Sequence, residues 1–299
     1  MKTAAKRCRV ILNPAARGEK AGRISLGHFP ESCRVEVVLS RAAGHATELA
    51  RKAVEEGLEL VVAAGGDGTV NEVANGIAGS GAVLGILPLG SVNVLARELG
   101  IPRHMDRAWK VVADGRARSI DLGKMTCGPG NSRKTRYFTQ LAGAGLDARA
   151  VQRVTRAQKR IWGPLSYVFA GLKVAAENSP PVRVELDGRP AIEGACVIFG
   201  NGRFYGGPFA ILKRARIDDG WLDTCIFQKQ GYWNLLHYLQ GVLRRTHTRF
   251  EDVSYAKARN ARVTADAEIP IEVDGEMLGF LPAEVEIIPL GLKVMVPLE

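Results

Sequence analysis

A glycine-rich stretch that contains one carboxylate is the segment of this sequence best suited to chemistry. Residues 61–64 are apolar, residues 65–69 read Gly-Gly-Asp-Gly-Thr, and a helical pattern starts directly behind them. Glycine lets backbone amides approach an anion closely, and the first amides of a helix carry partial positive charge. The stretch is therefore predicted to bind phosphate, although its spacing matches neither of the two common nucleotide fingerprints.

The carboxylate in this stretch favours a functional interpretation. A glycine-rich turn between a strand and a helix can serve a purely structural purpose. Asp67 changes this, because a carboxylate among bare amides has little structural purpose unless a cation or a substrate hydroxyl completes the site.

Two further loops follow other strand-like segments. Residues 11–14 read Ile-Leu-Asn-Pro, and residues 87–93 read Leu-Pro-Leu-Gly-Ser-Val-Asn. Loops at the carboxyl ends of parallel strands gather at one edge of a sheet, where ligands bind. The three loops are therefore expected to converge on one polyphosphate.

The elements that position these loops alternate between strand and helix. The periodicity predicts strands at 9–12, 34–39, 59–64 and 83–87, and helices at 45–56 and 70–77. This is a parallel α/β pattern, and it predicts a first domain over residues 1–124.

Beyond this point apolar and polar residues alternate, which predicts a β-rich domain over residues 125–299. Asp-Gly pairs at 187–188 and 274–275 predict two hairpins, and apolar spacing predicts a helix at 232–245. Whether the last residues of the chain return to the first domain stays open.

Composition excludes several classes of protein. The 299 residues are 46% hydrophobic, and no apolar run approaches the roughly 20 residues that span a bilayer. No secretory signal is evident, and five single cysteines without ligand spacing indicate reduced thiols in the cytoplasm. A net charge of +10 favours acidic partners such as nucleotides, anionic membranes or nucleic acid.

Taken in order, these motifs resemble the diacylglycerol kinase catalytic domain superfamily, which includes bacterial lipid kinases, sphingosine kinases and ceramide kinases. The resemblance continues through residues 143–147, 200–201, 217–223 and 273–276 and so covers nearly the whole chain. Gly-Gly-Asp-Gly-Thr alone is shared with NAD kinases. The resemblance implies an α/β nucleotide-binding domain and a β-rich, sandwich-like domain, with ATP and the lipid head meeting between them.

The resemblance also implies which residues contact the nucleotide and its Mg²⁺. These are Asn13, Ser40, Thr47, Gly65, Gly66, Asp67, Gly68, Thr69, Glu72, Ser91, Asn93 and Glu276. Ser91 stands where relatives usually carry threonine, and Val94 stands where many carry aspartate. Any role of that aspartate in substrate recognition is absent or replaced in this chain.

An acidic turn at residues 218–223 is the candidate for a second metal site. Several carboxylates broken by a glycine can curl around a divalent cation, or they can form an ordinary acidic turn. The resemblance implies the first alternative, with Asp218, the Trp221 carbonyl and Asp223 holding a structural Mg²⁺.

Two carboxylates are candidates for the general base. Asp274 at the second hairpin turn resembles the acid that deprotonates the lipid hydroxyl, and Asp67 matches the residue given that role in sphingosine-type relatives. We expect Asp274 to be the base and Asp67 to organise Mg-ATP, with the reverse assignment as the alternative.

The expected function is ATP-dependent phosphorylation of a lipid hydroxyl, with diacylglycerol as the default substrate. A long-chain base, or a soluble substrate as in NAD kinases, remains open, and so does a non-enzymatic nucleotide or nucleic-acid binder, although no nucleic-acid motif is present.

The basic residues 149–160, followed by aromatic residues, are expected to dock on anionic lipid at the inner face of the membrane; the alternative is a solvated basic helix. A homodimer is left open.

Overall fold

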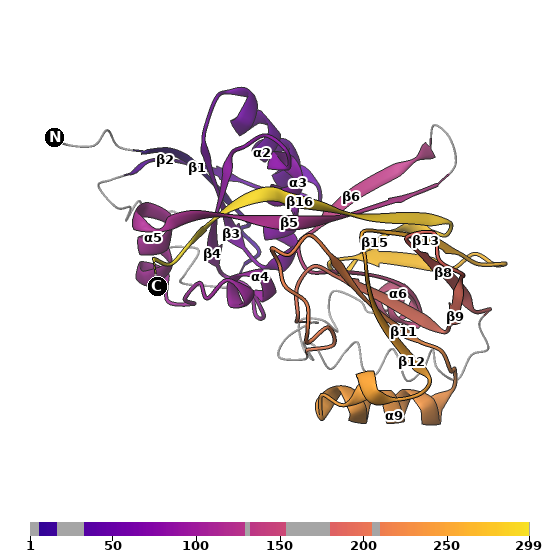
Figure 1. The fold of residues 1–299 in the computed structure, drawn as a ribbon. Coiled ribbons are helices and arrows are strands. Elements are labelled where there is room, and N and C mark those ends of the chain that lie inside the picture. The colour runs from indigo at the N-terminus through magenta and orange to yellow at the C-terminus, as the bar shows by residue number, and fades with distance from the viewer. Residues whose placement is uncertain (1–5, 17–32, 129–131, 154–179, 205–209, 299) are drawn as a thin grey trace. The chain divides into compact units, whose positions relative to one another are not determined.

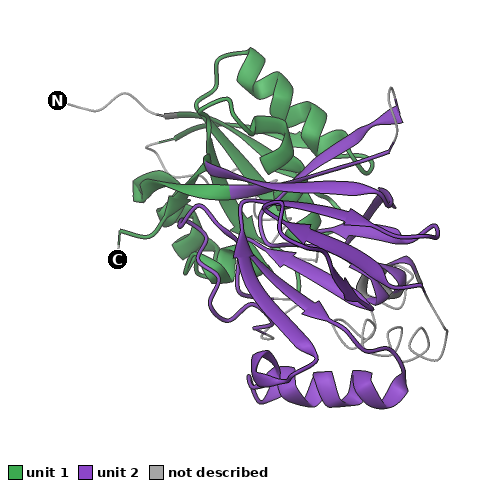
Figure 2. Ribbon diagram, turned by 45° about the vertical axis from the view of Figure 1, so that its right-hand side comes forward, with its two compact units in different colours: residues 1–121, 290–299 green, residues 122–289 purple. Residues whose placement is uncertain are grey.

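The computed structural model describes residues 6–16, 33–128, 132–153, 180–204 and 210–298. The chain divides into two compact units: residues 1–121 with 290–299 form unit 1, and residues 122–289 form unit 2 (Figure 2). The sequence analysis places a domain boundary after residue 124.

Unit 1 is built on a parallel sheet in the order β2-β1-β3-β4-β16 (Figure 1). These strands are β1 (Lys6–Leu12), β2 (Cys33–Leu39), β3 (Leu60–Gly65), β4 (Val83–Pro88) and the end of β16 (Ala283–Val296). Every residue of β3 is buried, as expected of a strand covered on both faces. All four predicted strands are confirmed.

Among the described residues of unit 1, four helices accompany this sheet. They are α2 (His45–Glu55), α3 (Asp67–Ile77), the short α4 (Val94–Glu98) and α5 (Met105–Asp114). Helices α2 and α3 pack closely because Gly76 has no side chain: a Cβ there would lie 2.6 Å from the Cβ of Ala50. The predicted helices at 45–56 and 70–77 are confirmed.

Unit 2 contains a six-stranded antiparallel sheet in the order β12-β11-β10-β7-β14-β15. Its strands are β7 (Leu141–Gly145), β10 (Cys196–Gly200), β11 (Leu222–Phe227), β12 (Val253–Ala258), β14 (Pro270–Val273) and β15 (Glu276–Phe280). The turn at Asp274 and Gly275, both with positive φ, joins β14 to β15 and confirms the second predicted hairpin.

Further strands of unit 2 face this sheet. They are β5 (Arg116–Cys127), β6 (Lys134–Phe138), β8 (Val182–Leu186), β9 (Ile192–Gly194), β13 (Asn260–Thr264) and the beginning of β16. β13 pairs with both β16 and β8, and β8 pairs with β9 across the first predicted hairpin turn. Strands β5 and β16 each contribute residues to both units.

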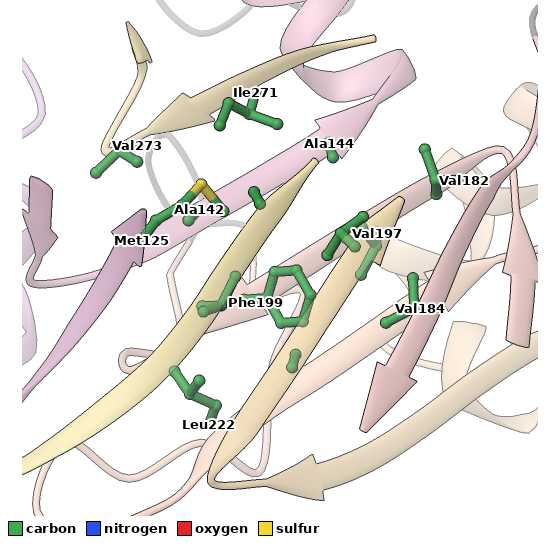
Figure 3. Close-up of a cluster of buried hydrophobic side chains, with 14 of the residues drawn as sticks. Met125, Ala142, Ala144, Val182, Val184, Val197, Phe199, Leu222, Ile271 and Val273 are labelled. Atoms are coloured by element: carbon green, nitrogen blue, oxygen red, sulfur yellow. The ribbon is translucent and has the colours of Figure 1, made fainter. Parts of the chain in front are cut away.

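The core of unit 2 is a cluster of apolar side chains from both sets of strands (Figure 3). Phe138, Phe199 and Val184 are completely buried in it. Alternate residues of each strand point into this layer, which is the pattern of a β-sandwich. The predicted fold class, an α/β domain followed by a β-rich, sandwich-like domain, is confirmed.

Two further α-helices lie within the part of unit 2 that the structure describes. They are α6 (Leu146–Arg153) and α9 (Tyr232–Leu243), and the second confirms the helix predicted at 232–245. Most of the basic segment at 149–160 lies outside the described residues. Among the helices that the structure describes, none is long and apolar enough to cross a membrane.

All five cysteines are buried thiols without a disulfide. Burial, with a smaller contribution from Cys33, raises the pKa of Cys8 to about 12, and burial raises that of Cys225 to about 12. Both thiols therefore stay protonated and unreactive at neutral pH.

Candidate active site

The loop between β3 and α3 forms the phosphate-binding candidate of unit 1. β3 ends at Gly65 and α3 begins at Asp67, so the first-turn amides of α3, which have no partner within the helix, lie at the carboxyl end of the sheet. Gly65 must be glycine, because a Cβ there would lie 2.3 Å from Thr69 Oγ1. Asn13 donates from Nδ2 to the same Thr69 oxygen at 3.2 Å, which brings the loop after β1 to the site.

Asp67 ties this loop to the one after β4. Its Oδ2 accepts a hydrogen bond from the backbone amide of Asn93 at 3.1 Å, and its Oδ1 accepts one from that of Val94 at 2.5 Å. A carboxylate at the start of a helix is electrostatically favourable, and it satisfies amides that lack partners within the helix. Asp67 therefore fixes the relative positions of two of the predicted loops.

The two glycine loops touch through their backbones. A Cβ on Gly90 would lie 2.6 Å from the Cα of Gly66, so no side chain fits there. Buried Asn93 completes the turn: its Oδ1 accepts from Gly90 N at 2.9 Å, and its Nδ2 donates to Gly90 O at 2.7 Å. The Asn93 side chain is thus used inside the loop, whereas Ser91 is exposed and can present its hydroxyl to a ligand.

Arg103 brings a positive charge to this loop that the sequence analysis missed. Its Nη2 donates to the carbonyl oxygen of Ser91 at 3.0 Å and to that of Gly90 at 3.4 Å. The side chain is exposed, and a guanidinium is well suited to phosphate. A lone arginine twelve residues beyond Ser91 gives no sequence signal of this contact.

Glu72 is occupied by protein rather than turned toward the phosphate loop. Its Oε1 accepts from Gly44 N at 2.9 Å and its Oε2 from Ala46 N at 3.0 Å, at the start of α2. The Thr47 hydroxyl donates to the Glu72 carbonyl at 2.9 Å, and Ser40 is buried beside β1, its amide bonded to Leu12 O. The contacts expected for Glu72 and Thr47 with a nucleotide therefore lack support from their hydrogen bonds.

Asp274 holds a tight turn in unit 2. Its Oδ2 accepts from Thr139 N at 2.9 Å and from Thr139 Oγ1 at 3.2 Å, while its Oδ1 accepts from Gln140 N at 3.1 Å and Leu141 N at 2.9 Å. Four donors stabilise the ionised carboxylate. Asp274 thus links the β14–β15 hairpin to the start of β7.

Buried polar side chains surround this aspartate, and the sequence analysis did not single out all of them. Asn201 donates to Thr139 O at 3.1 Å, and Glu272 accepts from Gly275 N at 2.7 Å. Both side-chain polar atoms of Gln140 are buried without a hydrogen-bond partner among the described residues. Buried polar groups are normally paired, so Gln140 marks a position where a ligand can supply a partner. The expected contact Glu276 is half-exposed and pairs with Arg136 at 2.7 Å.

The proposed second metal site of unit 2 holds an ammonium group. Lys257 Nζ lies 2.5 Å from Asp219 Oδ2 and 3.6 Å from Asp223 Oδ2. Asp223 is completely buried and also accepts from the Tyr255 hydroxyl at 2.6 Å. Asp218 lies 3.8 Å from the Arg216 guanidinium. Asp219 is therefore the carboxylate that shares the Lys257 ammonium with Asp223, and Asp218 as a metal ligand stays a prediction.

With Lys257 in place, an ammonium group already balances the charge of Asp219 and Asp223. Burial raises the pKa of Asp223, and the hydrogen bond from Tyr255 and the Lys257 charge oppose that rise. Burial lowers the pKa of Lys257, but its two aspartate partners outweigh that effect and raise the pKa. The ammonium thus provides the positive charge that Mg²⁺ was expected to provide. No cluster of three potential metal ligands occurs within the described ranges.

Removal of this ammonium is expected to make unit 2 depend on added metal. Lys257→Met leaves the buried Asp223 without its cation and should destabilise the protein by about 2 kcal/mol. Thermal melting with Mg²⁺ or with EDTA measures this. The native melting temperature should be the same in both, whereas the variant should regain stability in Mg²⁺. A native melting temperature that falls in EDTA would contradict the assignment.

Comparison with known families covers both units. The diacylglycerol kinase catalytic domain matches residues 7–125, and the YegS C-terminal NAD kinase beta sandwich-like domain matches residues 140–296. The two matches follow the order of the α/β and β-rich parts of the chain.

Individual relatives match along almost their entire length. The diacylglycerol kinase of Staphylococcus carnosus is 30% identical over 305 residues, covering 98% of this chain and 95% of the relative. That of Staphylococcus aureus strain MRSA252 is 31% identical over 291 residues, covering 93% and 88%. A crystal structure of a diacylglycerol kinase from Bacillus anthracis aligns with a TM-score of 0.76 at 22% identity, covering 98% and 97%, and shows the same fold. The chain belongs to the diacylglycerol kinase family, a family of lipid kinases that transfer phosphate to an alcohol.

Proposed function

We propose that this chain transfers the γ-phosphate of ATP to the free hydroxyl of diacylglycerol. The observation that carries the proposal is the phosphate loop of unit 1, in which Asp67 joins the Gly-Gly-Asp-Gly-Thr turn to the loop after β4. The names of the relatives support diacylglycerol as the acceptor.

The residues of unit 1 hold the nucleotide in this proposal. The first-turn amides of α3 bind phosphate oxygens, and Arg103 adds a positive charge beside Ser91. The hydrogen bond between Asn13 and Thr69 stabilises the loop. Glu72 acts indirectly in this proposal, because its carboxylate fixes the start of α2.

The residues around Asp274 act on the lipid hydroxyl. All four acceptor positions of its carboxylate are filled, so it takes up a proton only after one donor withdraws. The Thr139 hydroxyl makes the longest of these bonds, at 3.2 Å, and can rotate away from Oδ2. We assign Oδ2 of Asp274 as the proton acceptor, and we assign Gln140 to bind a polar group of the lipid head.

The proposed transfer forms one bond to the γ-phosphorus and breaks one. The lipid oxygen forms a bond to the γ-phosphorus, the bond from that phosphorus to the β–γ bridging oxygen breaks, and ADP leaves. The hydroxyl proton passes to Asp274. Phosphoryl transfer depends chiefly on positioning and charge neutralisation, so the loop of unit 1 is expected to contribute at least as much as the base.

Magnesium enters the proposal only with ATP. When bound, Mg²⁺ neutralises charge on the transferred phosphate. The partly exposed carboxylate of Asp67 is the group on the phosphate loop suited to hold it. Two amides engage Asp67 as two others engage Glu72, but Glu72 is buried. Peripheral action at the anionic inner face of the membrane belongs to the proposal, and a homodimer stays a prediction.

A transfer assay tests the function. Labelled γ-phosphate from Mg-ATP is offered to mixed micelles of diacylglycerol, a long-chain base or ceramide, and separately to NAD in solution. The expected result is labelled phosphatidic acid. Phosphorylation of NAD, or tight ATP binding without any labelled product, would overturn the proposal. Phosphorylation of the long-chain base or ceramide instead would show that the acceptor is a sphingoid lipid.

A further inference from the structure

The outer face of α9 exposes large apolar side chains. Trp233 is 79% exposed, Leu243 66% and Tyr232 45%, and Leu236 between them is partly exposed. Tyr232 and Trp233 pack edge to face with ring centroids 5.4 Å apart. Exposed tryptophan and leucine on one helix cost free energy in water, so such a face indicates a partner.

The opposite face of the same helix is firmly anchored. Tyr238 packs on Phe227 with ring centroids 4.9 Å apart and donates its hydroxyl to Asp252 at 2.9 Å. Val242 is buried, and a Cβ on Gly241 would lie 2.4 Å from the Phe250 ring. The helix therefore presents its apolar residues from a fixed position in unit 2 (Figure 1).

The charge on this helix and its flanking residues is predominantly positive, although Tyr238 and Lys229 both contact Asp252. Residues 224–250 contain no aspartate or glutamate. The cationic side chains of the same segment are Lys229, Arg244, Arg245 and Arg249, all of them exposed. Arginines at the end of an apolar helix can extend their charged groups to an anionic surface while the apolar residues enter it.

We propose that α9 is the element that docks this chain on an anionic membrane. Tyr232, Trp233 and Leu243 enter the headgroup boundary, and Arg244 and Arg245 bind lipid phosphates. An amphipathic helix with tryptophan on one face and arginine beside it is suited to lie in that interface. The inference rests on the proposed lipid kinase function, because a dissolved substrate would not require a membrane.

Vesicle binding of the full chain tests this surface. The probe is vesicles of phosphatidylcholine with about 30% phosphatidylglycerol, compared with pure phosphatidylcholine and with raised salt. Sedimentation of native protein should need the anionic lipid and should weaken as salt rises. Trp233→Ser and Leu243→Ser should each weaken binding about tenfold, because each removes an apolar side chain from the interface.

Matched substitutions elsewhere serve as controls. Leu298→Ser changes a leucine that is 63% exposed, close to the 66% of Leu243, but lies in unit 1. It should leave vesicle binding unchanged. Arg244→Gln should weaken binding about fivefold, whereas Arg116→Gln, which changes an exposed arginine of unit 1, should not. Equal melting temperatures show that each variant is folded.

Two outcomes would overturn the proposal. Unchanged vesicle binding in Trp233→Ser and Leu243→Ser excludes α9 as the docking element. A dimer in solution that dissociates in Leu243→Ser, with no vesicle binding by native protein, assigns the face to a second copy of the chain. A short-chain, water-soluble diacylglycerol separates docking from catalysis: its phosphorylation should be equal in native protein and in the α9 variants. If native protein does not phosphorylate the short-chain diacylglycerol, the proposed function is overturned. Membrane docking by α9 is then decided by the vesicle-binding experiment alone.

Discussion

Asp67→Asn is expected to reduce phosphate transfer by about a hundredfold or more. The asparagine oxygen can accept one of the two amide hydrogen bonds from Asn93 and Val94, but its NH₂ group then faces the other amide. The negative charge that would hold Mg²⁺ is lost as well. Groups that orient phosphates typically contribute several kcal/mol to the transition state. Steady-state transfer to diacylglycerol in micelles measures the loss.

A surface aspartate of the same unit provides the control for this variant. Asp114 is exposed at the end of α5, and Asp114→Asn should leave the rate unchanged. Thermal melting shows whether Asp67→Asn is folded. A folded variant with a rate within about threefold of native protein would remove Asp67 from the proposed site.

Asp274→Asn is expected to have an effect of similar size for a different reason. The substitution removes the proposed proton acceptor, typically a loss of about a hundredfold or more, and its NH₂ group faces donors from residues 139–141. The dependence of the transfer rate on pH distinguishes a catalytic base from a residue that only supports the turn. If Asp274 is the base, the pH profile of the variant's residual rate should lose the acid limb that native protein shows. If Asp274 only supports the turn, the acid limb should remain and the melting temperature of the variant should fall.

Thr139→Val sharpens this test. It removes the hydroxyl donor at 3.2 Å but keeps the three backbone donors to Asp274. One acceptor position of the carboxylate is then open without any rotation, so transfer should stay within about threefold of native protein. A large loss in this variant would instead assign the Thr139 hydroxyl a direct contact with substrate.

The strand, glycine turn and helix of the candidate phosphate loop are the part of the site whose structure the sequence predicted best. A buried strand, a run of glycines and a helix start are neighbours along the chain, so local periodicity and glycine chemistry suffice to place them. The two Asp-Gly hairpins were predictable for the same reason, since the turn residues adopt the positive φ angles that this type of turn requires.

Glu72 illustrates a residue whose hydrogen-bond partners could not be predicted from the local sequence. It lies five residues after Asp67 on α3, and at about 100° per residue the two side chains point about 140° apart. They therefore lie on different sides of α3. That Glu72 binds the amides of Gly44 and Ala46 depends on how α2 packs on α3, which no local pattern reveals.

The acidic turn shows how strand register decides a site. Asp223 on β11 pairs directly with Lys257 on β12, so the ammonium is delivered by the alignment of two antiparallel strands. A shift of one residue would turn Lys257 to the opposite face of the sheet. The spacing of the acids predicts a place for a cation, but the identity of that cation depends on a strand 34 residues away.

The route of β16 has a consequence for how the protein is made. A nascent chain of 289 residues already contains all of unit 2 and every residue of the phosphate loop. It still lacks the strand whose Lys293 and Val294 pair with Val83 and Leu84 along the edge of β4, and the Leu290 amide that bonds to buried Asp121. Unit 1 is therefore expected to complete its folding only after all of unit 2 has been synthesised. ATP binding should appear only in nascent chains in which residues 290–296 have left the ribosome.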